Sequence, residues 1–185
     1  MTGVDLPFPL SGSTLIVGPS QVGKTRLTAR ALDAWIAREG PGGVVVFEFA
    51  PVVERDGRVL GGRLDRFTTI PDGTWHGVLD AHAPRADGTD DAETVALARD
   101  NAERAGRILD AAPEPNAVFV NDATIPFQHE TLDPGRLTAY CDRARCAVLN
   151  ALESDELGTS DPVSRRERDV LATVRAWADR TVELA

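Results

Sequence analysis

Residues Gly18 to Thr25 read GPSQVGKT and match the pattern G-x-x-x-x-G-K-[ST] at every fixed position. We call this stretch the glycine loop. Its glycines let the backbone curl so that successive N–H groups point inward and form a nest for an anion. Lys24 is long enough to reach the outer phosphates of a polyphosphate, and the Thr25 hydroxyl is an oxygen ligand suited to Mg²⁺. The stretch therefore predicts a phosphate-binding site.

The residues on either side of the glycine loop supply the context that this pattern requires. The apolar run Thr14 to Val17 leads into the loop as a strand, and a helix is expected from Lys24 to Arg38. The first turn of that helix adds unpaired N–H donors and the positive end of its dipole. Lys24 is also the single lysine among 20 basic residues. A compact ammonium is thus kept at the one position where a planar guanidinium fits poorly.

This arrangement resembles the Walker A motif of P-loop NTPases. The resemblance implies that ATP or GTP binds with Mg²⁺ along the glycine loop and the residue after it. The residues expected to contact the nucleotide are Gly18, Pro19, Ser20, Gln21, Val22, Gly23, Lys24, Thr25 and Arg26. The sequence has no N-K-x-D motif for guanine, which favours ATP over the role of a Ras-like GTPase.

The order of elements predicts an α/β fold with a doubly wound, mostly parallel sheet, as in a RecA-like P-loop NTPase. Strands are expected at 13–17, 43–49, 117–120, 146–152 and 181–184, and helices at 24–38, 90–112, 134–144 and from 162. The strand at 43–49 is apolar without alternation, which is typical of a strand covered on both faces. A length of 185 residues indicates a single domain, 1–185.

The region 51–89 is expected to be an irregular insert or lid. Asp56-Gly57 is a turn signal inside a hairpin, and a short strand is expected at 66–70. The stretch 75–89 is polar and contains His76 and His82. We interpret it either as an ordered lid or as a long surface loop.

Two carboxylates at expected strand ends join Lys24 as candidate catalytic residues. Asp122 follows an apolar strand and resembles a Walker B aspartate, which would help Thr25 to hold Mg²⁺. The alternative is a polar residue that caps a strand. Glu48 ends the second strand, where RecA-like ATPases often carry a glutamate that polarises the attacking water. The alternative for Glu48 is a carboxylate paired with an arginine.

Other charged residues have weaker claims to a catalytic role. One of Arg165, Arg166 and Arg168 could serve as an arginine finger or bind a phosphorylated substrate, but a solvated or salt-bridged helix face is the favoured interpretation for each. His76, His82 and His129 show no metal-ligand spacing and are expected to be loop residues. Cys141 and Cys146 are expected to be reduced, because no second pair of ligands accompanies them.

A looser similarity covers most of the chain. Gly23 to Arg26 and the tail are similar to adenosylcobinamide kinase/guanylyltransferase, which also has a RecA-like core. The tail residues concerned are Glu156-Leu157-Gly158, Pro162, Arg166-Glu167-Arg168-Asp169 and Ala178-Asp179. This similarity implies a small-molecule kinase. Guanylyl transfer is not expected, because that family uses a histidine shortly after the second strand and 51–67 contains none.

Composition narrows the choice of partners and compartment. A net charge of −9 and a pI of about 4.8 disfavour nonspecific binding to nucleic acid or anionic lipid. No signal peptide and no run of about 18 apolar residues is present, so the sequence predicts a cytoplasmic protein that does not span a membrane. Besides a nucleoside triphosphate, the expected partners are further copies of the chain or another protein.

Three functions remain open from the sequence. The first is a RecA-like module that hydrolyses ATP with Mg²⁺. The second is a small-molecule kinase of the cobinamide-kinase type. The third is a nucleotide-binding regulatory protein with little turnover. A kinase would build an acceptor pocket from 51–89, whereas an ATPase module would use that region to contact a partner.

Overall fold

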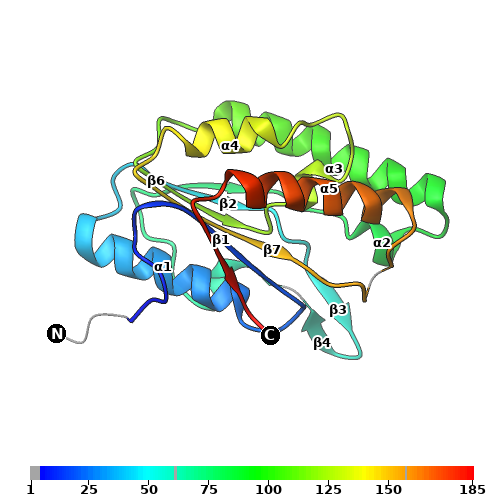
Figure 1. Ribbon diagram of the computed structural model, residues 1–185, viewed down its shortest axis with the longest axis horizontal. Helices are drawn as coiled ribbons and strands as arrows, with labels where there is room; N and C mark the ends of the chain where they lie inside the picture. Colours follow the sequence, from blue (N-terminus) through cyan, green and yellow to red (C-terminus); the bar gives the residue numbers. More distant parts are fainter. Residues whose placement is uncertain (1–4, 61, 157) are drawn as a thin grey trace.

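The computed structural model describes residues 5–60, 62–156 and 158–185 (Figure 1). A six-stranded, fully parallel sheet forms its centre, in the order β5–β2–β6–β7–β1–β8. The strands are β1 (Gly12–Gly18), β2 (Val44–Glu48), β5 (Trp75–Val78), β6 (Ala117–Asn121), β7 (Cys146–Leu152) and β8 (Arg180–Glu183). The predicted α/β class and parallel sheet are confirmed.

Helices cover both faces of the sheet, as a doubly wound fold requires. Helix α1 (Lys24–Glu39) lies on one face, and α3 (Asp91–Ala111), α4 (Gly135–Cys141) and α5 (Pro162–Trp177) lie on the other (Figure 1). Alternate residues of each strand face opposite sides, so the core divides in two. Val46 packs in the cluster that contains α1, and Val45 packs in the cluster that contains α3, α4 and α5.

The helix starts follow the capping signals in the sequence. Asp90 accepts a hydrogen bond from Glu93 N at 2.8 Å, and Asp161 accepts one from Ser164 N at 2.9 Å. The predicted helices around α1, α3 and α5 are confirmed to within a residue or two. Helix α4 is shorter than predicted and ends at Cys141, and a further turn separates it from β7.

The region 51–89 differs in part from its prediction. The hairpin is confirmed as β3 (Val53–Arg55) paired with β4 (Arg58–Leu60). The strand predicted at 66–70 is wrong. A 3₁₀ turn, η1 (Leu64–Arg66), takes its place because Leu64 is fully buried against the α1 side of the sheet and Thr68 N bonds back to Leu64 O.

The stretch 75–89 is more regular than predicted. Trp75–Val78 forms β5 and pairs in parallel with β2 at the edge of the sheet. Trp75 packs edge-on against Phe47 with ring centroids 5.7 Å apart, and Gly77 leaves room for Ile108 of α3. Tertiary packing thus makes a strand from a mixed, polar sequence. A short helix, α2 (Pro84–Asp87), follows.

The two cysteines are free, as predicted, and the structure shows that both are buried. Cys141 ends α4 and Cys146 begins β7, and burial raises the pKa of both thiols. Thiols with raised pKa values are poor nucleophiles. Within the described ranges, no helix is both long enough and apolar enough to cross a bilayer.

Candidate functional site

The glycine loop joins β1 to α1 through a backbone with three residues in the left-handed region. Gly18, Gln21 and Gly23 have φ values of 155°, 63° and 100°. A Cβ on Gly18 would lie 2.4 Å from Leu184 O, so no larger residue fits there. Among the described hydrogen bonds, none is donated by the backbone N–H groups of 20–26. These donors are therefore available to an anion.

Lys24 lies across the glycine loop. Its ammonium donates a hydrogen bond to the backbone oxygen of Pro19, at the other side of the loop. Partial burial lowers the pKa of Lys24, and the carboxylates of Asp122 and Glu156 oppose that shift. The single lysine is thus held over unpaired N–H groups, with two carboxylates in its field.

Three polar side chains lie side by side where the middle strands end. Glu48 and Asn121 are the last residues of β2 and β6, Asn150 lies two residues before the end of β7, and the strand pairing places Glu48 opposite Asn121. All three are on the face covered by α1, two residues beyond Val46, Phe119 and Val148 respectively. We call this set the polar row. It lies beneath the first two turns of α1.

The side-chain amide of Asn121 has one allowed orientation. Its Nδ2 donates to Glu48 Oε1 and, at 2.8 Å, to Gly62 O, and both of these atoms are acceptors. Its Oδ1 accepts from Asn150 Nδ2 at 3.1 Å and from the Thr25 hydroxyl at 3.3 Å. Reversing the amide would set N–H against N–H and oxygen against oxygen. The Asn121 oxygen is therefore fixed toward Thr25.

Asn150 ties the polar row to α1 and to the next loop. Its Nδ2 also donates to the Thr28 hydroxyl at 2.9 Å, and its Oδ1 accepts from Asp122 N at 2.9 Å. Thr28 in turn donates to Lys24 O at 3.0 Å. Every polar atom of this buried amide has a partner, which gives the start of α1 a fixed position relative to β6 and β7.

Glu48 is a fully buried carboxylate with both oxygens engaged. Oε2 accepts from Leu64 N at 2.8 Å, and Oε1 accepts from Asn121. Burial raises the pKa of Glu48 to about 7, although the bonds from Leu64 and Asn121 lower it. Glu48, the residue predicted to polarise the attacking water, thus orients the side-chain amide of Asn121. No arginine forms a described salt bridge with Glu48.

Asp122 begins the loop after β6 and has a left-handed φ of 64°. Its Oδ1 accepts from the Thr124 hydroxyl at 3.1 Å, and burial raises its pKa against the opposing field of Lys24. The charges of Asp122 and Lys24 thus lie close enough to influence each other's pKa. The hydrogen bond that the Thr25 hydroxyl donates, however, is accepted by Asn121 Oδ1. The role of Asp122 as a magnesium ligand stays a prediction.

A buried ion pair lies behind Asp122. Arg85 of α2 contacts Glu167 of α5 at 2.5 Å, and less than a tenth of either side chain is exposed. Glu167 Oε1 lies 2.9 Å from the Thr124 hydroxyl. Burial raises the pKa of Glu167, with Arg85 opposing the shift and Asp122 adding to it. A single hydroxyl proton therefore lies between two carboxylates.

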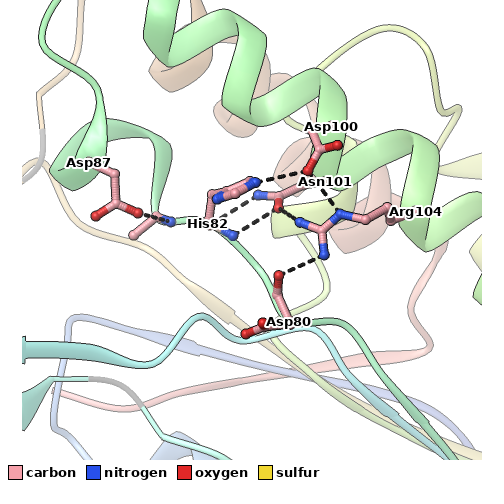
Figure 2. Close-up of polar contacts among 7 residues, drawn as sticks. Asp80, His82, Asp87, Asp100, Asn101 and Arg104 are labelled. Carbon is pink, nitrogen blue, oxygen red and sulfur yellow. Dashed lines mark hydrogen bonds and ion pairs between the residues drawn. The ribbon is translucent and has the colours of Figure 1, made fainter.

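The segment before α2 is held on α3 by His82 (Figure 2). His82 Nε2 lies 2.8 Å from Asp100 Oδ2, and the His82 backbone exchanges two hydrogen bonds with the buried Asn101. Arg104 donates to Asp80 O at 2.7 Å. His82 is thus a structural loop residue, as expected. Its bonds to α3 fix the segment that leads into α2, where Arg85 contacts Glu167.

The remaining sequence candidates make contacts of their own. Arg166 donates to Phe127 O at 3.2 Å and Arg168 to Thr159 O, and no described contact links Arg165 to the glycine loop. His129 lies 2.6 Å from the Thr131 hydroxyl. His76, expected in a loop, lies instead half-buried on β5, and burial lowers its pKa. An arginine finger thus stays a prediction for this helix.

The donor set beside Lys24 fits Mg²⁺. The Thr25 hydroxyl and the Asn121 oxygen are adjacent, and Mg²⁺ prefers oxygen ligands that it supplements with water and substrate phosphates. No cluster of three or more His, Cys, Asp or Glu residues able to hold a metal occurs in the described part of the chain.

Comparisons with known proteins add no family. The sequence matches no protein-family model and no curated protein sequence.

Four residues of this site were missed from the sequence. Asn121 and Asn150 were passed over because residue type alone drew attention to the carboxylate at 122. Counting alternate residues from Phe119 to Asn121, and from Val148 to Asn150, would have placed both amides on the face of the sheet that α1 covers. The pairing of Arg85 with Glu167 has no comparable signal, because the two lie 82 positions apart in loosely patterned segments.

Proposed function

We propose that this protein binds a nucleoside triphosphate with Mg²⁺ at the glycine loop and hydrolyses it, as a RecA-like P-loop ATPase does. The observation that carries the proposal is the set of unpaired N–H groups of 20–26, with the Lys24 ammonium folded over them. That arrangement suits a polyphosphate, since it combines backbone donors, a helix N-terminus and a compact cation.

Each part of the site has a role in this proposal. Lys24 would exchange Pro19 O for the β- and γ-phosphate oxygens, which carry more charge than a carbonyl. Thr25 and Asn121 would hold the Mg²⁺ ion, and Glu48 would keep the Asn121 oxygen turned toward it. When bound, Mg²⁺ neutralises charge that develops on the phosphates. Asp122, close to Lys24, is the carboxylate that would orient the attacking water.

A second function, nucleotide binding with little turnover, is favoured by the state of Glu48. A fully buried carboxylate whose two oxygens both already accept N–H donors has no oxygen free to take a proton from water, so it is a poor general base. If Asp122 does not replace it, hydrolysis is slow and the protein acts through its bound nucleotide.

Isothermal titration with ATP, GTP and their non-hydrolysable analogues, with and without Mg²⁺, tests the proposal. We expect Mg²⁺-dependent binding, with a parallel rise in melting temperature because the ligand binds the native state alone. Steady-state phosphate release then separates the two functions. Absence of binding by every nucleotide would refute both.

A further inference from the structure

A cavity lies beside the glycine loop but does not include it. Its volume is about 290 Å³, which corresponds to about ten water molecules at 30 Å³ each. It lies between the end of β7, the first half of α5 and the short helix α2. The charged residues that line it are Arg85, Glu153, Asp155, Glu167, Arg168 and Arg175. A molecule of roughly ten non-hydrogen atoms fits this space.

The inner wall of the cavity is the buried ion pair of Arg85 and Glu167. Burying two charges is costly, and an apolar pair of the same size would often be more stable. Arg85 also donates to the Ser164 hydroxyl at 3.1 Å, so its guanidinium is fixed on two sides. A rigid, charged wall in a cavity of this size is typical of a site that recognises a polar ligand.

The outer wall still has hydrogen-bond capacity. Arg168 and Arg175 lie seven residues apart, on the same face of α5. Both Nη atoms of Arg175 donate to Glu153, at 3.2 and 2.7 Å, and its buried Nε has no partner among the described residues. The one described bond of Arg168 uses Nη2, and its remaining N–H donors suit a carboxylate or a phosphate. Asp155 and Ser154, in the segment after β7, offer oxygen atoms to a hydroxyl group.

The cavity is linked to the glycine loop through the side chain of Thr124. Glu167 lines the cavity, and its neighbour Thr124 has its hydroxyl between Glu167 and Asp122. Asp122 is in the field of Lys24. In addition, Glu153 N donates to Gly18 O at 3.0 Å, so the segment that lines the cavity also supports the loop. A ligand in the cavity therefore acts on residues that face the nucleotide.

We propose that this cavity binds a second ligand, a small hydroxylated anion such as a hydroxy acid or its phosphate ester, and that Thr124 couples it to the glycine loop. The coupling rests on the proposed nucleotide function, whereas the binding of the anion does not. The anionic group is held by Arg168, and by Arg175 in exchange for a bond to Glu153, and the hydroxyl group faces Asp155.

Calorimetric titration with glycerol, glycerate and glycerol 3-phosphate tests the binding, because these share one carbon skeleton and differ in charge. We expect saturable binding of at least one anion and none of glycerol. Ala172→Phe, which fills the cavity from exposed Ala172, should abolish that binding, whereas Ala176→Phe on the same helix outside it should not. Binding should also survive Lys24→Ala, which excludes capture of the anion by the glycine loop.

Titration of the same samples with Mg–ATP separates this inference from the proposed function. Anion binding without ATP binding would retain the cavity site and refute the nucleotide function. ATP binding with no anion bound, or anion binding that persists in Ala172→Phe, would refute the cavity site. We expect the bound anion to change the Kd for Mg–ATP by roughly fivefold or more. Thr124→Val should remove this change and Thr124→Ser should keep it; an unchanged effect in Thr124→Val would refute the coupling.

Discussion

The side-chain oxygen of Asn121 lies 3.3 Å from the hydroxyl of Thr25 and joins the end of β6 to the first turn of α1. Glu48 and Gly62 hold that oxygen in place, because they accept both N–H bonds of the same amide. The candidate metal ligands are thus positioned by a carboxylate that does not touch the metal site itself.

Removing the Lys24 ammonium should remove nucleotide binding but not the fold. Lys24→Ala loses charge-assisted bonds to phosphate, each worth about 1.5–3 kcal/mol, so we expect the Kd for Mg–ATP to rise by at least about tenfold. Calorimetry measures this, and circular dichroism checks the fold. Arg30→Ala, on an exposed turn of the same helix, is the matched control and should bind normally. Equal affinity in Lys24→Ala and wild type would contradict the role of the loop.

Exchanging the carboxylate of Glu48 and the amide of Asn121 should separate the effect of charge on stability from the effect of the hydrogen bond between them. Asn121→Asp alone sets three acceptors against one another in a buried site, and we expect a loss of at least about 2 kcal/mol in the free energy of unfolding. The double variant Glu48→Gln, Asn121→Asp restores a donor between the two residues and should recover part of that loss.

Urea denaturation of the wild type, Glu48→Gln, Asn121→Asp and the double variant measures the coupling between these two positions. Additive losses in the double variant would show that the pair is not coupled.

Glu48 should make the stability depend on pH. Its pKa rises from 4.5 in the unfolded chain to about 7 in the folded protein, so the folded state binds the proton more tightly. Stability from this group is therefore fully present below pH 4.5 and is lost as the pH rises through 7, by about 3 kcal/mol in total. We expect Glu48→Gln to show a smaller fall in unfolding free energy between pH 5.5 and 8 than the wild type. Equal falls in both proteins would rule out Glu48 as the titrating group.

Asp122→Asn should keep nucleotide binding and lose turnover. The amide preserves the shape of the side chain but removes the negative charge that faces Lys24. We expect nearly unchanged Mg–ATP affinity and a fall in phosphate release of roughly 100-fold. Asp91→Asn, at the exposed start of α3, is the control. If the variant keeps its rate and its dependence on Mg²⁺, another carboxylate performs this step.

The predictable part of this structure is the part specified by local sequence. The glycine loop and the apolar runs of β2, β6 and β7 are contiguous signals, so their elements and shared sheet edge were predicted. The choice between Asn121 and Asp122 depends on which face of β6 each residue occupies, and only Asn121 continues the alternation from Phe119. Strand β5 and the Arg85–Glu167 pair depend on packing between distant segments, for which the sequence has no local pattern.

The Thr25–Asn121 contact also has a consequence for the order of binding. Both oxygens are electrically neutral, so this pair attracts free Mg²⁺ much less than two carboxylates would. We therefore expect the metal to enter together with the triphosphate, as a preformed complex, and to leave with the product. Magnesium alone should not raise the melting temperature, although magnesium with ATP should.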